Sequence, residues 1–147
     1  MTIQRSTRLR TRHGVTVVET AAVLSVLLLI LFSVFEYGRY LMVENLLINA
    51  VRDGSRYALV HCQDATVVAD VQAVVRQKMA GLDSQLTGLD IQVFPTNSPT
   101  AALNSTNPDD PITVQASGTF RALFPQMPYM PGTFTMRSAS MMTCEGN

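Results

Sequence analysis

A glycine followed five residues later by a glutamate is the pair whose spacing most directly indicates chemistry in this chain. Gly14 immediately precedes Val15, and Glu19 is the only charged residue in the 21-residue run 15–35. A peptidase that cuts the Gly14–Val15 bond needs a small residue before that bond, and glycine has no side chain to obstruct it. Cleavage would leave a positive amine on Val15. Glu19, further along the helix, could then neutralise such an amine on a neighbouring helix.

The element that carries these residues is an apolar segment long enough to cross a bilayer. A membrane-spanning helix needs about 20 apolar residues, and residues 15–35 supply 21. Basic residues stay on the cytoplasmic side, so the arginines before the segment predict a cytoplasmic N-terminus and export of everything after Phe35 (Arg5, Arg8, Arg10 and Arg12). An ordinary secretory signal is rejected, because its apolar region runs only about 7–15 residues before a small-residue cleavage site.

A second interpretation of Glu19 is positional and involves no processing. A carboxylate in the first turn of a helix meets the positive end of the helix dipole. Near the membrane interface it also costs less free energy than at the centre of the bilayer. The residues alone leave both interpretations open.

The patterns around the apolar segment resemble one protein family. The basic leader, Gly14, Glu19 and the hydrophobic helix are similar to a type IV prepilin signal. The stretches Glu36-Tyr37-Gly38-Arg39 and Asn49-Ala50-Val51-Arg52-Asp53-Gly54-Ser55-Arg56-Tyr57-Ala58 are similar to the signature of TadE-like proteins, the minor pseudopilins of tight-adherence (Flp) pilus systems. The resemblance covers about residues 12–60, with a weaker one at 138–145. It marks these signature residues: Glu36, Gly38, Arg39, Arg52, Gly54, Arg56 and Tyr57.

The resemblance implies a structural role in pilus assembly. The protein would span the bacterial inner membrane once, with its C-terminal domain in the periplasm, and a prepilin peptidase would cut it after Gly14. Its partners would be other pilus and pseudopilin subunits, and it would need no cofactor and no small-molecule substrate. The alternative is an unprocessed, membrane-anchored periplasmic adaptor of a secretion or pilus complex.

Charge and motif content argue against nucleic-acid binding and against catalysis. The chain has 147 residues and is formally neutral, with 11 basic and 11 acidic residues. Without the four leader arginines, seven basic residues remain against eleven acidic ones, a net charge of −4. That charge is unsuited to neutralising phosphates. The sequence contains no glycine-rich phosphate loop and no H-E-x-x-H motif, and its only histidines are His13 and His61. It therefore predicts that the protein is not an enzyme.

Two cysteines, Cys62 and Cys144, lie 82 positions apart beyond the apolar segment. In an exported chain with a modest core they predict a disulfide, which could stabilise the fold by roughly 4 kcal/mol. A metal site formed by these cysteines and His61 would lack a fourth ligand and any ligand-type spacing. A catalytic pair of His61 and Cys62 is disfavoured, because adjacent residues do not face each other on a helix.

Helical spacing continues beyond the membrane segment and then gives way to strand spacing. An apolar face predicts an amphipathic helix to about residue 60, formed by Val43, Leu46, Leu47, Ala50, Val51, Gly54 and Ala58. A second helix is predicted after Asp64 or Thr66, with the stripe Val67, Val71, Val74, Val75 and Leu82. Alternation predicts strands near 89–93, 112–124 and 134–144, with Ile112, Val114 and Phe120 on one face of the second strand. Gly118 interrupts that strand and predicts a bulge.

These elements predict an α+β fold with a small antiparallel sheet of three or more strands. We expect four regions along the chain. They are a cytoplasmic basic leader (1–14), a transmembrane helix (15–35), an extracytoplasmic amphipathic stalk helix (36–61) and a small α+β periplasmic head domain (62–147).

Overall fold

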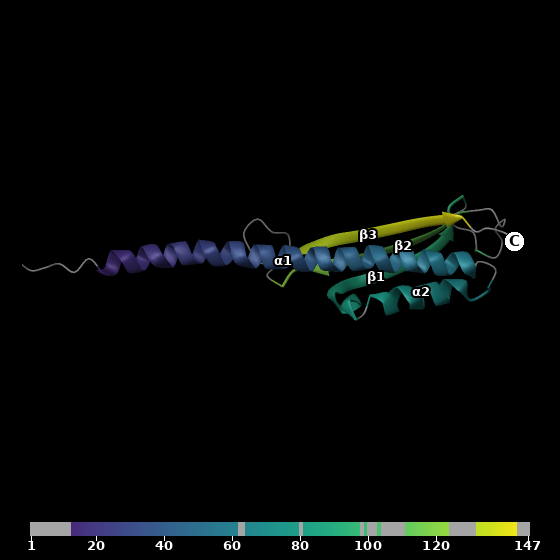
Figure 1. Ribbon diagram of the computed structural model, residues 1–147, viewed down its shortest axis with the longest axis horizontal. Coiled ribbons are helices and arrows are strands. Elements are labelled where there is room, and N and C mark those ends of the chain that lie inside the picture. The colour runs from purple at the N-terminus through teal and green to yellow at the C-terminus, as the bar shows by residue number, and fades with distance from the viewer. Residues whose placement is uncertain are drawn as a thin grey trace, which may run out of the picture. The chain divides into compact units, whose positions relative to one another are not determined.

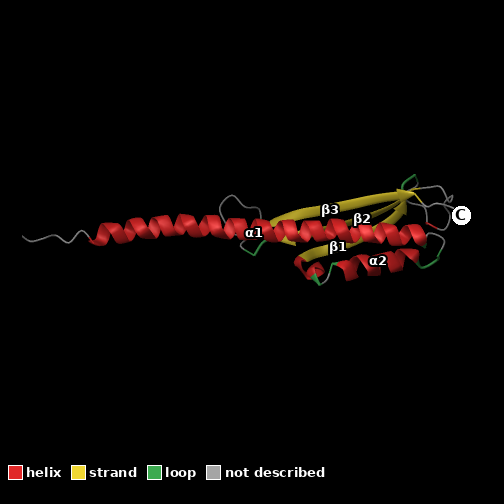
Figure 2. Cartoon of the chain, viewed as in Figure 1, coloured by secondary structure: helices red, strands yellow, loops and turns green. Residues whose placement is uncertain are grey.

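The longest helix of the protein, α1, begins at His13 and ends at Val60. It is followed by α2 (Val67–Lys78), a 3-10 turn η1 (Leu82–Gln85) and the strands β1 (Leu86–Pro95), β2 (Pro111–Arg121) and β3 (Thr133–Thr143). The strands form one antiparallel sheet in the order β1-β2-β3 (Figures 1 and 2). The α+β fold, with a long apolar N-terminal helix, a second helix and a three-stranded antiparallel sheet, is therefore confirmed.

The chain divides into two units, and their boundary falls inside α1. The computed structural model describes residues 13–61, 64–79, 81–97, 99, 103, 111–123 and 132–143, with the side chains of residues 13–15 and 83 outside the description. The N-terminal unit is Met1–Tyr37 and the C-terminal unit is Gly38–Asn147. Each unit is described by itself.

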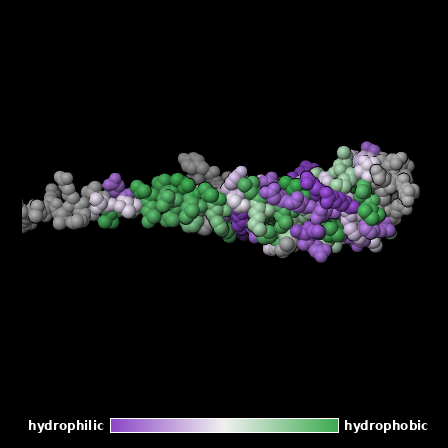
Figure 3. Space-filling view, viewed as in Figure 1, coloured by the Kyte–Doolittle hydropathy of each residue, from purple (hydrophilic) through white to green (hydrophobic). Residues whose placement is uncertain are grey.

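In the N-terminal unit, α1 presents apolar side chains to its surroundings on all sides. From residue 16 to residue 35 every side chain is exposed except Ser33, which is half-buried. In the described chain, α1 is the one helix long and apolar enough to cross a membrane, and Figure 3 shows the apolar surface of this segment. A helix that is hydrophobic all round belongs in a large core or in a membrane. The exposure of these side chains favours the membrane.

Four residues with hydroxyl groups interrupt this apolar surface (Thr16, Thr20, Ser25 and Ser33), and the last three donate to carbonyls of the same helix. Thr20 donates to the carbonyl of Thr16, Ser25 to that of Ala21 and Ser33 to that of Leu29, all at 2.8 Å. Lipid offers no alternative hydrogen-bond partner to such groups. These internal bonds therefore make the segment compatible with a hydrocarbon environment.

The core of the C-terminal unit is formed by one face of α1, one face of α2 and one face of the sheet. The predicted apolar face of α1 is confirmed: Val43, Leu47, Ala50, Val51, Gly54 and Ala58 are buried and Leu46 is half-buried. An amphipathic helix needs another element to cover its apolar stripe. Here α2 and the sheet provide that cover, so residues 38–60 belong to the same unit as the sheet.

The second helix follows its predicted stripe as far as Val75, with Val74 half-buried, but Leu82 lies beyond the helix, in η1. Val67, Val71 and Val75 are buried, and so is Met79 just beyond the helix end. Thr66 is the N-cap residue, but its hydroxyl donates to the carboxylate of Asp70 at 2.8 Å and makes no capping bond to the backbone.

The sheet confirms the predicted alternation of buried and outward residues but not the predicted bulge. Along β2 the pairing with β3 runs without a shift from Pro111 to Arg121, so the prediction of a bulge at Gly118 is wrong. The irregularity lies in β1, between Thr87 and Asp90. There Gly88 has a φ of 67°, a conformation that glycine adopts readily. Gly118 instead permits close packing, because a Cβ there would lie 3.3 Å from the Leu86 Cβ.

Candidate functional site

The proposed cleavage bond lies at the start of α1. Gly14 and Val15 are its second and third residues, and their side chains are outside the described part. Glu19 is exposed. Because α1 begins at His13, no acidic residue lies in its first turn, and Glu19 lies in the second. The helix dipole acts mainly within the first turn, so the positional interpretation of Glu19 is weakened for the uncut chain.

The signature residues divide between the core and the surface. Glu36 has only 1% of its surface exposed, and Gly54 is also buried, whereas Gly38, Arg52 and Arg56 are exposed. A short motif in one helix therefore contains residues that build the fold and residues that remain available on its surface.

Arg39 is fixed against the end of the sheet. Its guanidinium donates to the carbonyl of Arg121 at 2.8 Å and to the side chain of Gln85 at 3.3 Å. Its central carbon lies 4.6 Å from the centroid of the Phe120 ring, a cation–π geometry. Sequence reasoning marked Arg39 only through the family resemblance, because its partners lie 46 and 82 positions away along the chain.

An aromatic cluster beside Arg39 was missed in the sequence. The Tyr40 ring lies 5.8 Å from that of Phe120 at an interplanar angle of 87°. It also lies 5.5 Å from the ring of Phe134. Edge-to-face and tilted contacts of this kind stabilise aromatic pairs beyond the burial of their area. The only signal in the sequence was strand alternation, which places Phe120 and Phe134 on the face of their strands that carries the other apolar residues.

Gly54 marks the closest approach of α1 to its neighbours. A Cβ placed on Gly54 would lie 2.6 Å from the Cγ2 of Val75, 3.4 Å from the Cγ1 of Val71 and 3.8 Å from the Cγ1 of Val114. The first of these distances is shorter than any ordinary contact. Gly54 is therefore required for the packing of α1 against α2 within its own chain.

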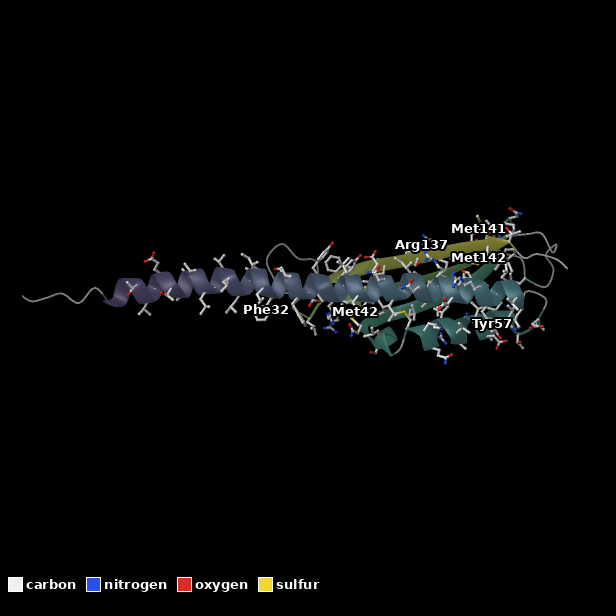
Figure 4. The ribbon with its side chains drawn as sticks, viewed as in Figure 1. Phe32, Met42, Tyr57, Arg137, Met141 and Met142 are labelled. Carbon is white, nitrogen blue, oxygen red and sulfur yellow. The ribbon has the colours of Figure 1, made fainter. Side chains whose placement is uncertain are left out.

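On the polar side of α1, Asp53 connects the two helices. Its carboxylate lies 3.3 Å from the Lys78 ammonium of α2 and 3.8 Å from the Arg56 guanidinium. These side chains are more than a third exposed, so solvent screens the pairs and each contributes little to stability. Tyr57 lies near the end of α1 (Figure 4). Its ring stacks on that of His61, with ring centroids 4.1 Å apart.

Ser55 joins α1 to β3. Its hydroxyl is buried and lies 2.9 Å from the carbonyl of Val51 and 3.4 Å from that of Ser140. Ser55 is seven residues before Cys62, and Ser140 is four residues before Cys144. Both cysteines lie outside the described residues, so the disulfide stays a prediction.

We expect Cys144→Ser to make the C-terminal unit sensitive to protease while the membrane helix still inserts. Losing a link across 82 positions would remove roughly 4 kcal/mol of stabilisation in the chain-entropy model. The measurement is limited proteolysis of the membrane-extracted protein, with Cys62→Ser expected to behave identically and the double variant to be no worse. Ready alkylation of both thiols in the native exported protein would show that no disulfide forms.

Among the described residues, no three His, Cys, Asp or Glu side chains gather into a group that could hold a metal ion. What the described chain offers is packing surface: an exposed apolar helix segment and a C-terminal unit with a polar outer face. These features are suited to association with other helices and proteins.

Comparison with known proteins identifies one family. Residues 14–56 match the family model described as TadE-like protein, which is the family that the sequence resembles. The matched segment begins at Gly14 and includes the signature residues up to Arg56; it covers fewer than a third of the 147 residues. Searches of curated proteins and of solved structures found no match.

Proposed function

We propose that the protein is a structural pseudopilin of a tight-adherence pilus system, with no enzymatic activity of its own. The observation that carries the proposal is the TadE-like match over residues 14–56. This match coincides with a helix whose apolar side chains are exposed over the whole span from 16 to 35, apart from half-buried Ser33. Its partners would be the prepilin peptidase and other pilus and pseudopilin subunits.

The topology follows from the leader. Four arginines precede the apolar segment, and basic residues remain on the cytoplasmic side of the inner membrane. The C-terminal unit would therefore lie in the periplasm. Cleavage after Gly14 would remove all four arginines together. Once the helix has inserted, it would therefore no longer carry the basic leader that orients it.

After cleavage, Glu19 would be the fifth residue of the mature chain, and Val15 would carry a positive amine. Neither charge is favourable in lipid alone. When helices assemble with an offset along their axes, the Glu19 carboxylate of one helix can neutralise the Val15 amine of its neighbour. An acid that pairs only in the assembly favours the assembled state over the isolated subunit. This arrangement gives Glu19 a role in association and none in insertion.

We expect Glu19→Ala to insert normally but to associate poorly with the other pilus subunits. Removing the carboxylate favours partitioning into lipid. In the assembly, however, it leaves the partner amine unpaired, at a cost of several kcal/mol where the charge is buried. Because about 1.4 kcal/mol is a tenfold change in affinity, co-purified subunits should fall at least about tenfold.

Two further variants serve as controls for this experiment. Glu19→Asp keeps the charge and should retain part of the association, and Thr20→Ala changes the adjacent residue and should retain all of it. Normal pilus numbers and normal co-purification in Glu19→Ala would reduce Glu19 to a tolerated acid near the membrane interface.

A further inference from the structure

A cavity of about 510 Å³ opens on the C-terminal unit where α1, η1 and the ends of β1 and β2 meet. Its volume lies within the range of about 300–1,000 Å³ that is typical of ligand sites. The side chains that give it its chemistry are two arginines, two hydroxyls, an amide and a leucine: Arg39, Arg121, Ser84, Thr87, Gln85 and Leu123. We call it the arginine cavity. No acidic residue is among the described residues that line it.

The two arginines of this cavity are held differently. Arg39 is fixed by its bonds to the Arg121 carbonyl and to Gln85 and by the Phe120 ring. Arg121 is exposed at the end of β2, and within the described residues its side chain makes no ion pair. A rigid guanidinium and an adaptable one thus share a single cavity, with hydroxyl and amide donors beside them.

These groups suit a phosphate. Guanidinium groups bind phosphate oxygens through paired, charge-assisted hydrogen bonds, and the hydroxyl of Thr87 can donate to a remaining oxygen. The Ser84 hydroxyl donates to the carbonyl of Gly81 at 2.9 Å, so it contributes a polar group to the wall of the cavity and no donor to the ligand. Leu123, with 57% of its surface exposed, adds an apolar group at the rim. A ligand that carries a phosphate next to an apolar portion would satisfy both features.

The position of the cavity in the chain brings it close to a membrane surface. The apolar segment ends at Phe35, and Arg39 follows four residues later on the same helix. Four residues span at most about 14 Å even when fully extended, and roughly 6 Å along a helix. The headgroup layer is roughly 5–8 Å deep on each side of the hydrocarbon, so it lies within reach of Arg39.

We propose that the arginine cavity binds the phosphate of an anionic phospholipid in the leaflet that faces the C-terminal unit. The proposal rests on the membrane anchoring of α1, which belongs to the proposed function, but not on processing after Gly14 or on pilus assembly. Bound lipid would fix the C-terminal unit against the membrane surface.

The test is native mass spectrometry of the full-length protein in mild detergent, titrated with phosphatidylglycerol and, separately, with phosphatidylcholine. Each Lys or Arg near an anionic lipid surface contributes an attraction equivalent to about a fivefold change in affinity. Phosphatidylglycerol should therefore bind Arg121→Gln about fivefold more weakly than wild type. Phosphatidylcholine, whose choline carries a positive charge, should bind wild type more weakly than phosphatidylglycerol does.

Arg137→Gln is the matched control. Arg137 is an exposed arginine on β3 (Figure 4); it donates to Gln115 at 2.6 Å and does not line the cavity. Its variant should bind phosphatidylglycerol as wild type does. Equal affinities of wild type and Arg121→Gln, or equal losses in both arginine variants, would overturn the proposal.

Two further arms separate the possible causes of a negative result. Inorganic phosphate alone should not displace the lipid; if it binds wild type with the same dependence on Arg121 and the lipid shows no advantage, the site takes soluble phosphate and the lipid proposal fails. Carbonate extraction of cell membranes should leave the wild-type protein in the pellet. Its release would refute the membrane anchoring itself. A protein that stays anchored but binds phosphatidylglycerol and phosphatidylcholine equally would refute only the lipid site proposed for the arginine cavity.

Discussion

The Gly54→Val variant is expected to lose the native packing of the C-terminal unit. A Cβ alone would lie 2.6 Å from the Val75 Cγ2. Val75 is fully buried, and its short, β-branched side chain cannot move away by changing its χ1 rotamer. The two methyl groups of valine would add to this overlap, so α1 and α2 would have to separate. Overpacking of this kind typically costs about 1–3 kcal/mol and occasionally more, a large fraction of the roughly 5–15 kcal/mol that stabilises a folded domain.

The measurement is thermal unfolding of the full-length protein in detergent, together with its resistance to protease. Gly38→Ala is the matched control, because Gly38 lies on the same helix and a Cβ there would meet nothing within 4 Å. It should unfold at the wild-type temperature or slightly higher, since alanine is a better helix former than glycine by about 0.5–1 kcal/mol. A Gly54→Val protein that unfolds with the wild type would contradict the packing described for α1 and α2.

The Gly14→Leu variant is expected to abolish processing. A leucine side chain directly before the scissile bond would occupy space that the peptidase leaves only for a residue without a side chain. On co-expression with the cognate prepilin peptidase, the wild-type chain should lose the leader, about 1.7 kDa, and the variant should lose nothing. Gly38→Leu, a glycine change on the same helix beyond the apolar segment, should be cut normally. Cleavage of Gly14→Leu at the wild-type rate would show that Gly14 does not define the site.

Periodicity predicted which faces are buried, but it could not identify what covers them. The spacing of Val43, Leu47 and Val51 places them on one side of a helix, and they are all buried. The same spacing is equally consistent with a free stalk that binds a partner chain. The shared core shows that α2 and the sheet supply the cover within the chain, and the close approach of Gly54 to Val75 shows how tightly α2 packs there.

The sheet shows a similar limit. The alternation of Ile112, Val114 and Phe120 predicted the buried face correctly, because side chains of a strand point alternately to its two faces. The location of the bulge could not be predicted in this way. A glycine in a strand can mark either a positive φ, as at Gly88, or a close approach of another chain segment, as at Gly118, and the sequence does not distinguish the two.

The environment of Arg39 was beyond sequence reasoning for a different reason. Its contacts come from residues in η1 and at the end of β2, so they depend on how the whole sheet returns to the first helix. The resemblance identified Arg39 as a signature residue, and the structure shows that it fixes the end of the sheet to α1. Arg121, which shares the arginine cavity, carried no signal in the sequence beyond its place at an outward strand position.

The central claim is that the chain enters the membrane as a precursor and is cut between Gly14 and Val15. The most direct measurement is the intact mass and N-terminal sequence of the protein extracted from membranes of pilus-producing cells. The full chain has a mass of 16.1 kDa, so cleavage should give a protein about 1.7 kDa lighter whose first residue is Val15. A full-length protein that begins at Met1 in those cells would contradict processing and would favour a permanently anchored adaptor.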